Sequence, residues 1–303
     1  MSKYLIINCD DFGQSKAANE AIIQLLEEGV VSSATIMPPA PAFEEAADWS
    51  RRHGRGRIGL HLTFTSEFAG YRWGSLTGSA SLRDGEGYLP LTVHEFEIQA
   101  APKDVKAEML AQFTAVRRAG IEISHADNHM GSLYGLETGR SYLPMVLWQC
   151  SRRRIPFRLC RNIYDKDTLL SGIPGVEATL AKIVRVADLM GVPIPDYLLS
   201  HPYTLQEGET YDTFKSSLIQ KLYELPYGVS ETYIHPAVHD PQMLKLIPSW
   251  EKRVWEYRLM LDGDFSHALK DARVELTDYH YVKTKLRRSR AVGLSRFIFP
   301  RST

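Results

Sequence analysis

The sequence predicts an α/β protein, and three observations carry that prediction. Apolar runs at 4–7, 30–37 and 58–64 alternate with helical patterns at 15–28 and 43–53. An alternation of this kind requires parallel strands joined by crossover helices. Polar residues recur where the predicted strands end, which is where barrels of parallel strands carry their active sites. No repeat or low-complexity linker divides the 303 residues, so we expect a single domain over 1–303, an irregular (β/α) barrel.

Local signals define the individual elements. Ser15 precedes the first helical pattern and Gly29 follows it, as expected of an N-cap and a C-terminal glycine. Pro38 stops the second strand, and Pro102 divides the helical pattern of 92–119 into two helices. Further strands are predicted at 121–129, 156–160, 197–201, 230–236 and 274–277, and further helices at 142–152, 176–190, 210–225, 250–261 and 265–272.

Two segments depart from the alternation. Residues 66–92 are rich in glycine and aromatic residues, and a long irregular segment of this kind is typically a lid or an insertion. Tyr71, Trp73 and Tyr88 in this insertion could stack on a sugar ring or could form a small core of their own. Residues 283–303 form a locally basic tail, which we interpret as a solvated tail or an oligomer contact.

Composition narrows the class of protein. The 36 basic and 36 acidic residues cancel, so net charge gives no sign of a nucleic-acid or membrane-surface partner. The three cysteines form no CxxC pattern, which fits a reducing compartment. The first strand follows the N-terminus with no basic-then-apolar leader, and no apolar run has membrane-spanning length. We therefore expect a cytoplasmic protein.

The first strand ends in two adjacent carboxylates, Asp10 and Asp11. Neighbouring buried acids repel each other and lose hydration, so a metal ion or a shared proton is needed to offset the cost. Other polar residues at predicted strand ends are His61, His125, Asp127, His129, Arg158, His201 and His235. In a parallel barrel these ends converge on one face.

One carboxylate and two neutral imidazoles are a common ligand set for a catalytic divalent metal. Asp11, His61 and His125 could supply it. Asp10 would then be free to accept a proton as general base, and His235 could give a proton to the leaving group. The ligand set suits zinc but also tolerates magnesium, manganese or cobalt.

Four motifs in this order resemble those of the YdjC-like carbohydrate deacetylases, the family that includes chitooligosaccharide deacetylases. They are Asn8-Cys9-Asp10-Asp11-Phe12-Gly13, Gly59-Leu60-His61-Leu62-Thr63, Ser124-His125-Ala126-Asp127-Asn128-His129 and Ile234-His235-Pro236-Ala237. The resemblance extends from residue 3 to about residue 240. The chain departs from better-studied members after Asp127, where those carry a histidine-rich run and this chain has Asn128-His129-Met130-Gly131.

The resemblance implies an irregular barrel related to polysaccharide deacetylases and a divalent metal held by Asp11, His61 and His125. It implies that Asp10 is the general base, that His235 is the general acid, and that the reaction removes an acetyl group from an N-acetylated sugar. A homodimer is implied in the same way.

Roles for the remaining polar residues stay open at this level. Asp127 is expected to orient His125 or cap a turn, and His129 to contact substrate or serve structure. Arg158 is expected to neutralise Asp10 or Asp127, with contact to a sugar hydroxyl as the alternative. Competing functions are a metal-dependent amidohydrolase or esterase on another substrate, a sugar isomerase, and a non-catalytic carbohydrate- or metal-binding protein.

Overall fold

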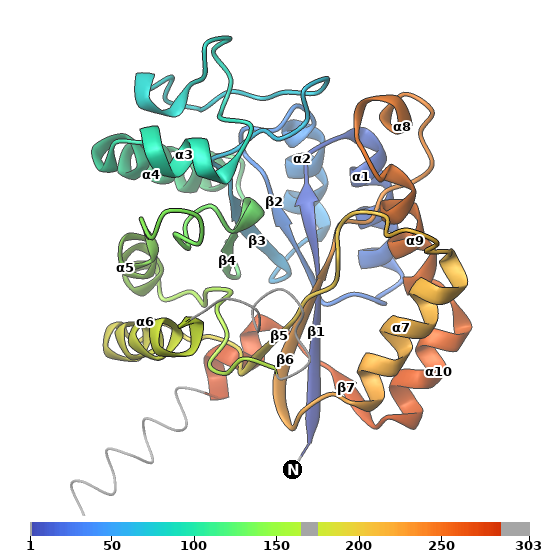
Figure 1. The fold of residues 1–303 in the computed structure, drawn as a ribbon. Helices are drawn as coiled ribbons and strands as arrows, with labels where there is room; N and C mark the ends of the chain where they lie inside the picture. The colour runs from blue at the N-terminus through green and yellow to red at the C-terminus, as the bar shows by residue number, and fades with distance from the viewer. Residues whose placement is uncertain (1, 165–174, 286–303) are drawn as a thin grey trace, which may run out of the picture.

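The computed structural model describes residues 2–164 and 175–285, and its centre is a curled sheet of parallel strands surrounded by helices (Figure 1). The strands are β1 (Lys3–Phe12), β2 (Ser33–Ile36), β3 (Ile58–Leu62), β4 (Ala126–Asn128), β5 (Tyr197–Leu199), β6 (Gly228–Ile234) and β7 (Val274–Leu276). Their order is β4-β3-β2-β1-β6-β5, and β7 also pairs with β1. The predicted irregular α/β barrel is confirmed.

Helices surround this sheet. They are α1 (Lys16–Glu27), α2 (Phe43–His53), α3 (Val93–Gln99), α4 (Pro102–Arg118), α5 (Leu143–Arg153), α6 (Val176–Met190), α7 (Tyr211–Tyr223), α8 (Met243–Leu246), α9 (Trp250–Met260) and α10 (Gly263–Asp271). The Ser15 hydroxyl accepts from the amide of Ala18 and caps α1, and Pro102 begins α4, so both local predictions are confirmed. Among the described residues, no helix is long and apolar enough to cross a membrane.

Strand β1 lies at the centre of the sheet. It pairs with β2 on one side and with β6 on the other, and Leu5, Ile6 and Ile7 are fully buried. A strand covered on both faces by packed elements needs a continuous apolar sequence, as β1 has before its two acids. The acids therefore lie at the end of a strand that packing holds firmly.

The predicted strand at 156–160 is wrong. Only Phe157 forms a bridge, to Ala126 of β4. The amide of Phe157 donates to Pro193 and that of Arg158 to Ala126, so this segment connects the β4 edge to the chain before β5 without forming a ladder. Pro156 contributes no amide hydrogen, which weakens a regular ladder here. The segment closes the barrel irregularly and places Arg158 in its interior.

The insertion, residues 66–92, lies above the carboxyl ends of the strands (Figure 1). The Arg72 guanidinium binds Asp84 at 2.6 Å, and the buried Glu108 of α4 accepts from the amides of Leu76 and Thr77 at 3.0 and 2.9 Å. These contacts hold the insertion as a folded cover. The predicted basic tail lies mostly outside the described residues, which end at 285; residues 279–285 are helical.

Candidate active site

Asp10 and Asp11 both face the site, although they are neighbours in a strand. Adjacent side chains of a regular strand point to opposite faces. Here the pairing of β1 with β2 shifts register between Cys9 and Phe12, and Asp11 has φ 64°, in the left-handed region. Such a conformation is costly for a residue other than glycine and is found most often at functional sites. The irregularity brings both buried carboxylates toward His61.

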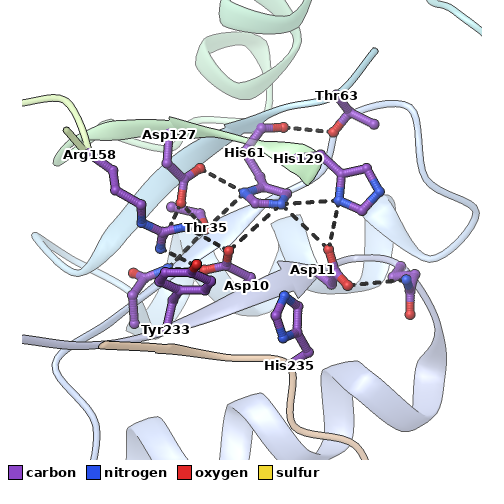
Figure 2. A network of polar contacts seen from close by, with 12 residues as sticks. Asp10, Asp11, Thr35, His61, Thr63, Asp127, His129, Arg158, Tyr233 and His235 are labelled. Carbon is purple, nitrogen blue, oxygen red and sulfur yellow. Dashed lines mark hydrogen bonds and ion pairs between the residues drawn. The ribbon is translucent and has the colours of Figure 1, made fainter. Parts of the chain in front are cut away.

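Three ligand atoms converge at this point (Figure 2). Asp11 Oδ1 lies 3.5 Å from His61 Nε2 and 3.2 Å from His129 Nδ1, and the two ring nitrogens are 3.3 Å apart. Among the described residues Asp11 Oδ1, which is buried, has no hydrogen-bond partner, whereas Oδ2 accepts from Arg253 and Gln14. Ligands at about 2.1 Å from a tetrahedral metal are separated by roughly 3.4 Å. Asp11, His61 and His129 therefore fit a divalent metal.

Each of the two histidines has a carboxylate behind it. His61 Nδ1 lies 2.7 Å from Asp127 Oδ1, and His129 Nε2 lies 2.8 Å from Glu67 Oε2. A proton on the nitrogen that faces the carboxylate leaves the other nitrogen, the one facing Asp11, free to bind a cation. Carboxylate partners of this kind orient metal-binding histidines and make them more basic.

The same carboxylates shift the pKa values of both rings. Burial by itself would lower the pKa of His61, but Asp127 and Asp10 outweigh burial and raise it to about 10. Burial opposes the shift at His129 as well, where Glu67 and Asp11 raise the pKa to about 9. In the metal-free protein both rings therefore hold a proton at neutral pH, which a metal has to displace.

Asp10 belongs to a different set of contacts. Burial tends to raise the pKa of its carboxyl group, but the Arg158 guanidinium outweighs burial and holds that pKa well below its usual range. Arg158 Nη1 and Nη2 each donate to one oxygen of Asp10 at 2.6 Å. A second group lies close enough together to bind a cation: Asp10, His61 and Asp127. Arg158, however, already neutralises the two carboxylates of this group. The set around Asp11 is the better metal site.

The position of His125 corrects the prediction of the ligand set. The ring of His125 stacks on Tyr279 at 3.8 Å, and its Nδ1 contacts the Ser124 hydroxyl at 2.8 Å. Its buried Nε2 has no hydrogen-bond partner within the part of the chain that the structure describes. It does not join Asp11 and His61. Asp127 is opposite His61 in the β3–β4 register, so His125 lies one inward-facing position below this level and His129 one above it. Asp11 lies on the His129 side of this level, and about 13 Å of extended chain separates His125 from His129, too far for His125 to share the site.

His235 lies across from this cluster, just past β6 (Figure 2). Its side chain is 16% exposed, its Nδ1 is 3.9 Å from Glu256 Oε2, and burial lowers the pKa of its ring. The backbone amide of His235 donates to Glu256 Oε2 at 2.6 Å, and Glu256 Oε1 binds His201 Nε2 at 2.6 Å. The ring of Tyr203, which is 47% exposed, lies 5.1 Å from that of His235.

The other predicted site residues have definite places. Arg158 binds both Asp10 and Asp127, as predicted, and Asp127 orients His61 and not His125. Trp73 is 3% exposed and donates its Nε1 hydrogen to the Thr65 carbonyl at 2.8 Å, so it packs in a core and cannot stack on a sugar. Tyr71 is half-buried and donates its hydroxyl to the Gln14 carbonyl at 2.9 Å.

Sequence reasoning missed three charged residues of the site. Glu67 comes from the insertion, and Arg253 and Glu256 come from one face of α9. Arg253 binds Asp11 Oδ2 at 2.8 Å. An arginine and a glutamate three residues apart in a helix are normally read as a solvated pair. Burial distinguishes Glu256 from a solvated surface glutamate, and no pattern in the sequence predicts that burial.

Comparison with known proteins agrees with this description. The model of the YdjC-like protein family matches residues 4–271. The chain belongs to the YdjC-like family. The carbohydrate deacetylase of Brevibacillus brevis is 29% identical over 246 residues, which are 76% of this YdjC-like chain and 94% of that relative. The carbohydrate deacetylase of Listeria monocytogenes is 27% identical over 280 residues, which are 91% of this chain and 98% of the relative.

A solved structure shares the fold of this YdjC-like chain. It is that of a protein from Enterococcus faecalis assigned provisionally to cellobiose-phosphate cleavage, with a TM-score of 0.72 and 23% sequence identity. The match covers 93% of this chain and 99% of the other. The resemblance predicted from the four motifs is confirmed as membership of the family.

Proposed function

We propose that this YdjC-like protein is a metal-dependent carbohydrate deacetylase that removes an acetyl group from an N-acetylated sugar. The observation that carries the proposal is the convergence of Asp11 Oδ1, His61 Nε2 and His129 Nδ1 within 3.5 Å of one another, directly beside Asp10. The names of the relatives, carbohydrate deacetylases over most of the chain, favour the sugar substrate.

In this proposal Asp11, His61 and His129 hold the cation. A divalent ion bound there would polarise the acetyl carbonyl and acidify water. The oxygen of a water molecule adds to the acetyl carbon, the carbon–nitrogen bond breaks, and acetate and a free amine leave. Written with neutral products, acetic acid and a free amine, the water gives up one proton and the leaving nitrogen gains one; the acetic acid then ionises to acetate at neutral pH.

Asp10 and His235 are placed to move that proton. Arg158 keeps Asp10 ionised at neutral pH, so its carboxylate can accept the proton of the attacking water, although the low pKa makes it a weak base. His235 faces the cluster from the opposite side and would protonate the leaving nitrogen (Figure 2). Burial lowers the pKa of the His235 ring, so the ring is neutral at pH 7 and must gain a proton before it can donate one. In the balance of the reaction, the proton that Asp10 takes from the water is the one that His235 gains and passes to the nitrogen.

The half-exposed Tyr203 supports a carbohydrate substrate. Its ring lies beside His235, and its hydroxyl contacts that of Tyr233 at 2.8 Å. An exposed aromatic ring next to the proposed acid suits the apolar face of a pyranose. Tyr203 therefore replaces Trp73 as the candidate for stacking on the sugar.

The proposal also includes zinc or magnesium as the metal, a cytoplasmic location and a homodimer.

Acetate release tests the proposal. The purified protein is stripped of metal, reloaded separately with zinc, magnesium, manganese or cobalt, and incubated with N-acetylated mono- and oligosaccharides. We expect acetate in stoichiometric amounts with free amine, none after chelation, and release slowed by roughly 10²–10⁴-fold with Asp10→Asn. Failure of every sugar with metal demonstrably bound would contradict it. Hydrolysis of simple esters or non-sugar amides, without hydrolysis of N-acetylated sugars, would favour the hypothesis of an amidohydrolase or esterase.

A further inference from the structure

A chain of buried hydrogen bonds runs through the barrel interior to Asp10. The hydroxyl of Tyr279 donates to Glu231 Oε2, and Glu231 Oε1 accepts from Arg158 Nε at 2.8 Å. Arg158 in turn binds both oxygens of Asp10 at 2.6 Å. All four residues are at most 4% exposed. Buried polar groups that are fully paired in this way hold one another in a single arrangement.

Glu231 decides which way the Arg158 guanidinium faces. A guanidinium is planar, so the direction of Nε–H fixes the directions of the two terminal nitrogens. Arg158 has a second acid within reach, because Nη2 also lies 2.9 Å from Asp127 Oδ2. Without the Nε contact to Glu231, the guanidinium could turn toward Asp127 and release one or both oxygens of Asp10. Glu231 thereby selects the two-point contact with Asp10.

Tyr279 is held by packing as well as by its hydrogen bond to Glu231. Its ring stacks on His125 with an interplanar angle of 11°, and His125 is backed by Gly59, where a Cβ atom would come within 2.6 Å of the His125 ring. Tyr279 therefore packs on a ring that is itself in close contact with Gly59. Tyr279 follows β7, so it lies outside residues 4–271, which match the family.

We propose that Glu231 and Tyr279 are positioning residues for Asp10: they orient Arg158 so that it holds the Asp10 carboxylate toward the reacting water. This inference rests on the proposed function, because it assigns the residues to the deacetylation. It also gives His125 a role, as the surface on which Tyr279 is packed.

Three variants test the proposal. Tyr279→Phe removes the hydroxyl and keeps the stack on His125, Glu231→Gln keeps an oxygen acceptor for Arg158, and Glu231→Leu removes it. The matched control is Tyr142→Phe, which removes another buried hydroxyl, the one donated to the Ala100 carbonyl at 2.9 Å. kcat, KM for the N-acetylated sugar and Kd for Zn²⁺ are measured for each, and crystal structures of the Tyr279→Phe and Glu231→Leu proteins are determined.

We expect kcat to fall about fivefold in Tyr279→Phe, the effect of one hydrogen bond, and about 100-fold in Glu231→Leu, the effect of a misplaced group. Glu231→Gln should recover most of the loss, while KM and the Kd for Zn²⁺ stay within about twofold and the control keeps its activity. In the Glu231→Leu crystal structure, Arg158 should no longer reach both oxygens of Asp10. If Glu231→Leu does not fold, Tyr279→Phe is compared with the wild type and with the Tyr142→Phe control, and an unchanged kcat in Tyr279→Phe then overturns the proposal.

Two outcomes would overturn the proposal. The first is an unchanged kcat in both Tyr279→Phe and Glu231→Leu. The second is an unchanged pair of Arg158–Asp10 contacts in the crystal structure of Glu231→Leu. Absence of acetate with the wild-type protein would count against the proposed function instead, and the crystal structures would still decide whether Glu231 and Tyr279 orient Arg158.

Discussion

The two histidines of the candidate metal site are supported in different ways. His61 lies within β3, and its partner Asp127 lies opposite it on β4, so both belong to the sheet. His129 lies beyond the end of β4, and its partner Glu67 comes from the insertion. The Asp127 side chain is fully buried, whereas that of Glu67 is 16% exposed.

This difference separates a rigid half of the site from an adjustable half. Strand pairing fixes the His61–Asp127 contact, and Arg158 and Thr35 hold Asp127 from two further directions. The His129–Glu67 contact depends on how the insertion packs on the barrel. We infer that the sheet half provides most of the metal affinity and the chemistry, and that the insertion half adjusts both.

The largest expected effect comes from the sheet half. Asp10→Asn should lower kcat by roughly 10²–10⁴-fold, the contribution of a general base. Metal binding should persist, because Asp10 is not among the three converging ligands. Acetate release and the Zn²⁺ content of the same preparation are measured together. Equal loss of metal and activity would contradict the proposal that Asp11 binds the metal and Asp10 only accepts the proton.

The next effect distinguishes the two candidate ligands on either side of Asp127. His129→Ala should weaken Zn²⁺ binding by roughly 100- to 1000-fold, about one quarter of the binding free energy of a four-ligand zinc site. His125→Ala should leave the Kd for Zn²⁺ within a few-fold, while the lost stack on Tyr279 costs about 2–4 kcal/mol of unfolding free energy. Calorimetric titration measures the Kd values, and urea unfolding measures stability. The reverse pattern of Kd values would restore His125 as a ligand.

Metal binding should depend on pH. Because the pKa values of His61 and His129 are raised to about 10 and about 9, protons compete with the metal below those values. Affinity should therefore rise with pH and level off above about pH 10, by up to about 100-fold per unit if both rings lose a proton. Titrations at pH 6.5, 7.5 and 8.5 in two buffers with different heats of ionisation count the protons released. A Kd independent of pH would show that neither ring binds the metal.

The smallest effect compares the two supporting carboxylates directly. Asp127→Asn and Glu67→Gln keep the shape of each side chain and remove its charge, and losses of such partners cost roughly 10–100-fold in metal affinity. We expect Asp127→Asn near the upper figure and Glu67→Gln near the lower, because Glu67 is partly solvated. The Kd for Zn²⁺ of each variant is the measurement. Equal losses would show that the insertion supports the site as rigidly as the sheet does.

Much of this site follows from sequence alone. The apolar run of β1 places Asp10 and Asp11 at a buried strand end, where two acids need a cation, and Gly59-Leu60-His61 places a histidine at another strand end. Arg158 was expected to neutralise Asp10 or Asp127, and it binds both. These conclusions depend only on strand periodicity and on the energetic cost of buried charge, which short stretches of sequence express directly.

Three further features were decided by tertiary structure. His125, Asp127 and His129 alternate along one segment, so periodicity puts all three on the same side, and only the β3–β4 register decides which of them reaches the level of Asp11. The left-handed backbone at Asp11 turns both acids into the site against the alternation of the strand. Glu67 and Glu256 come from an insertion and a late helix, and only long-range packing brings them to the histidines that they support.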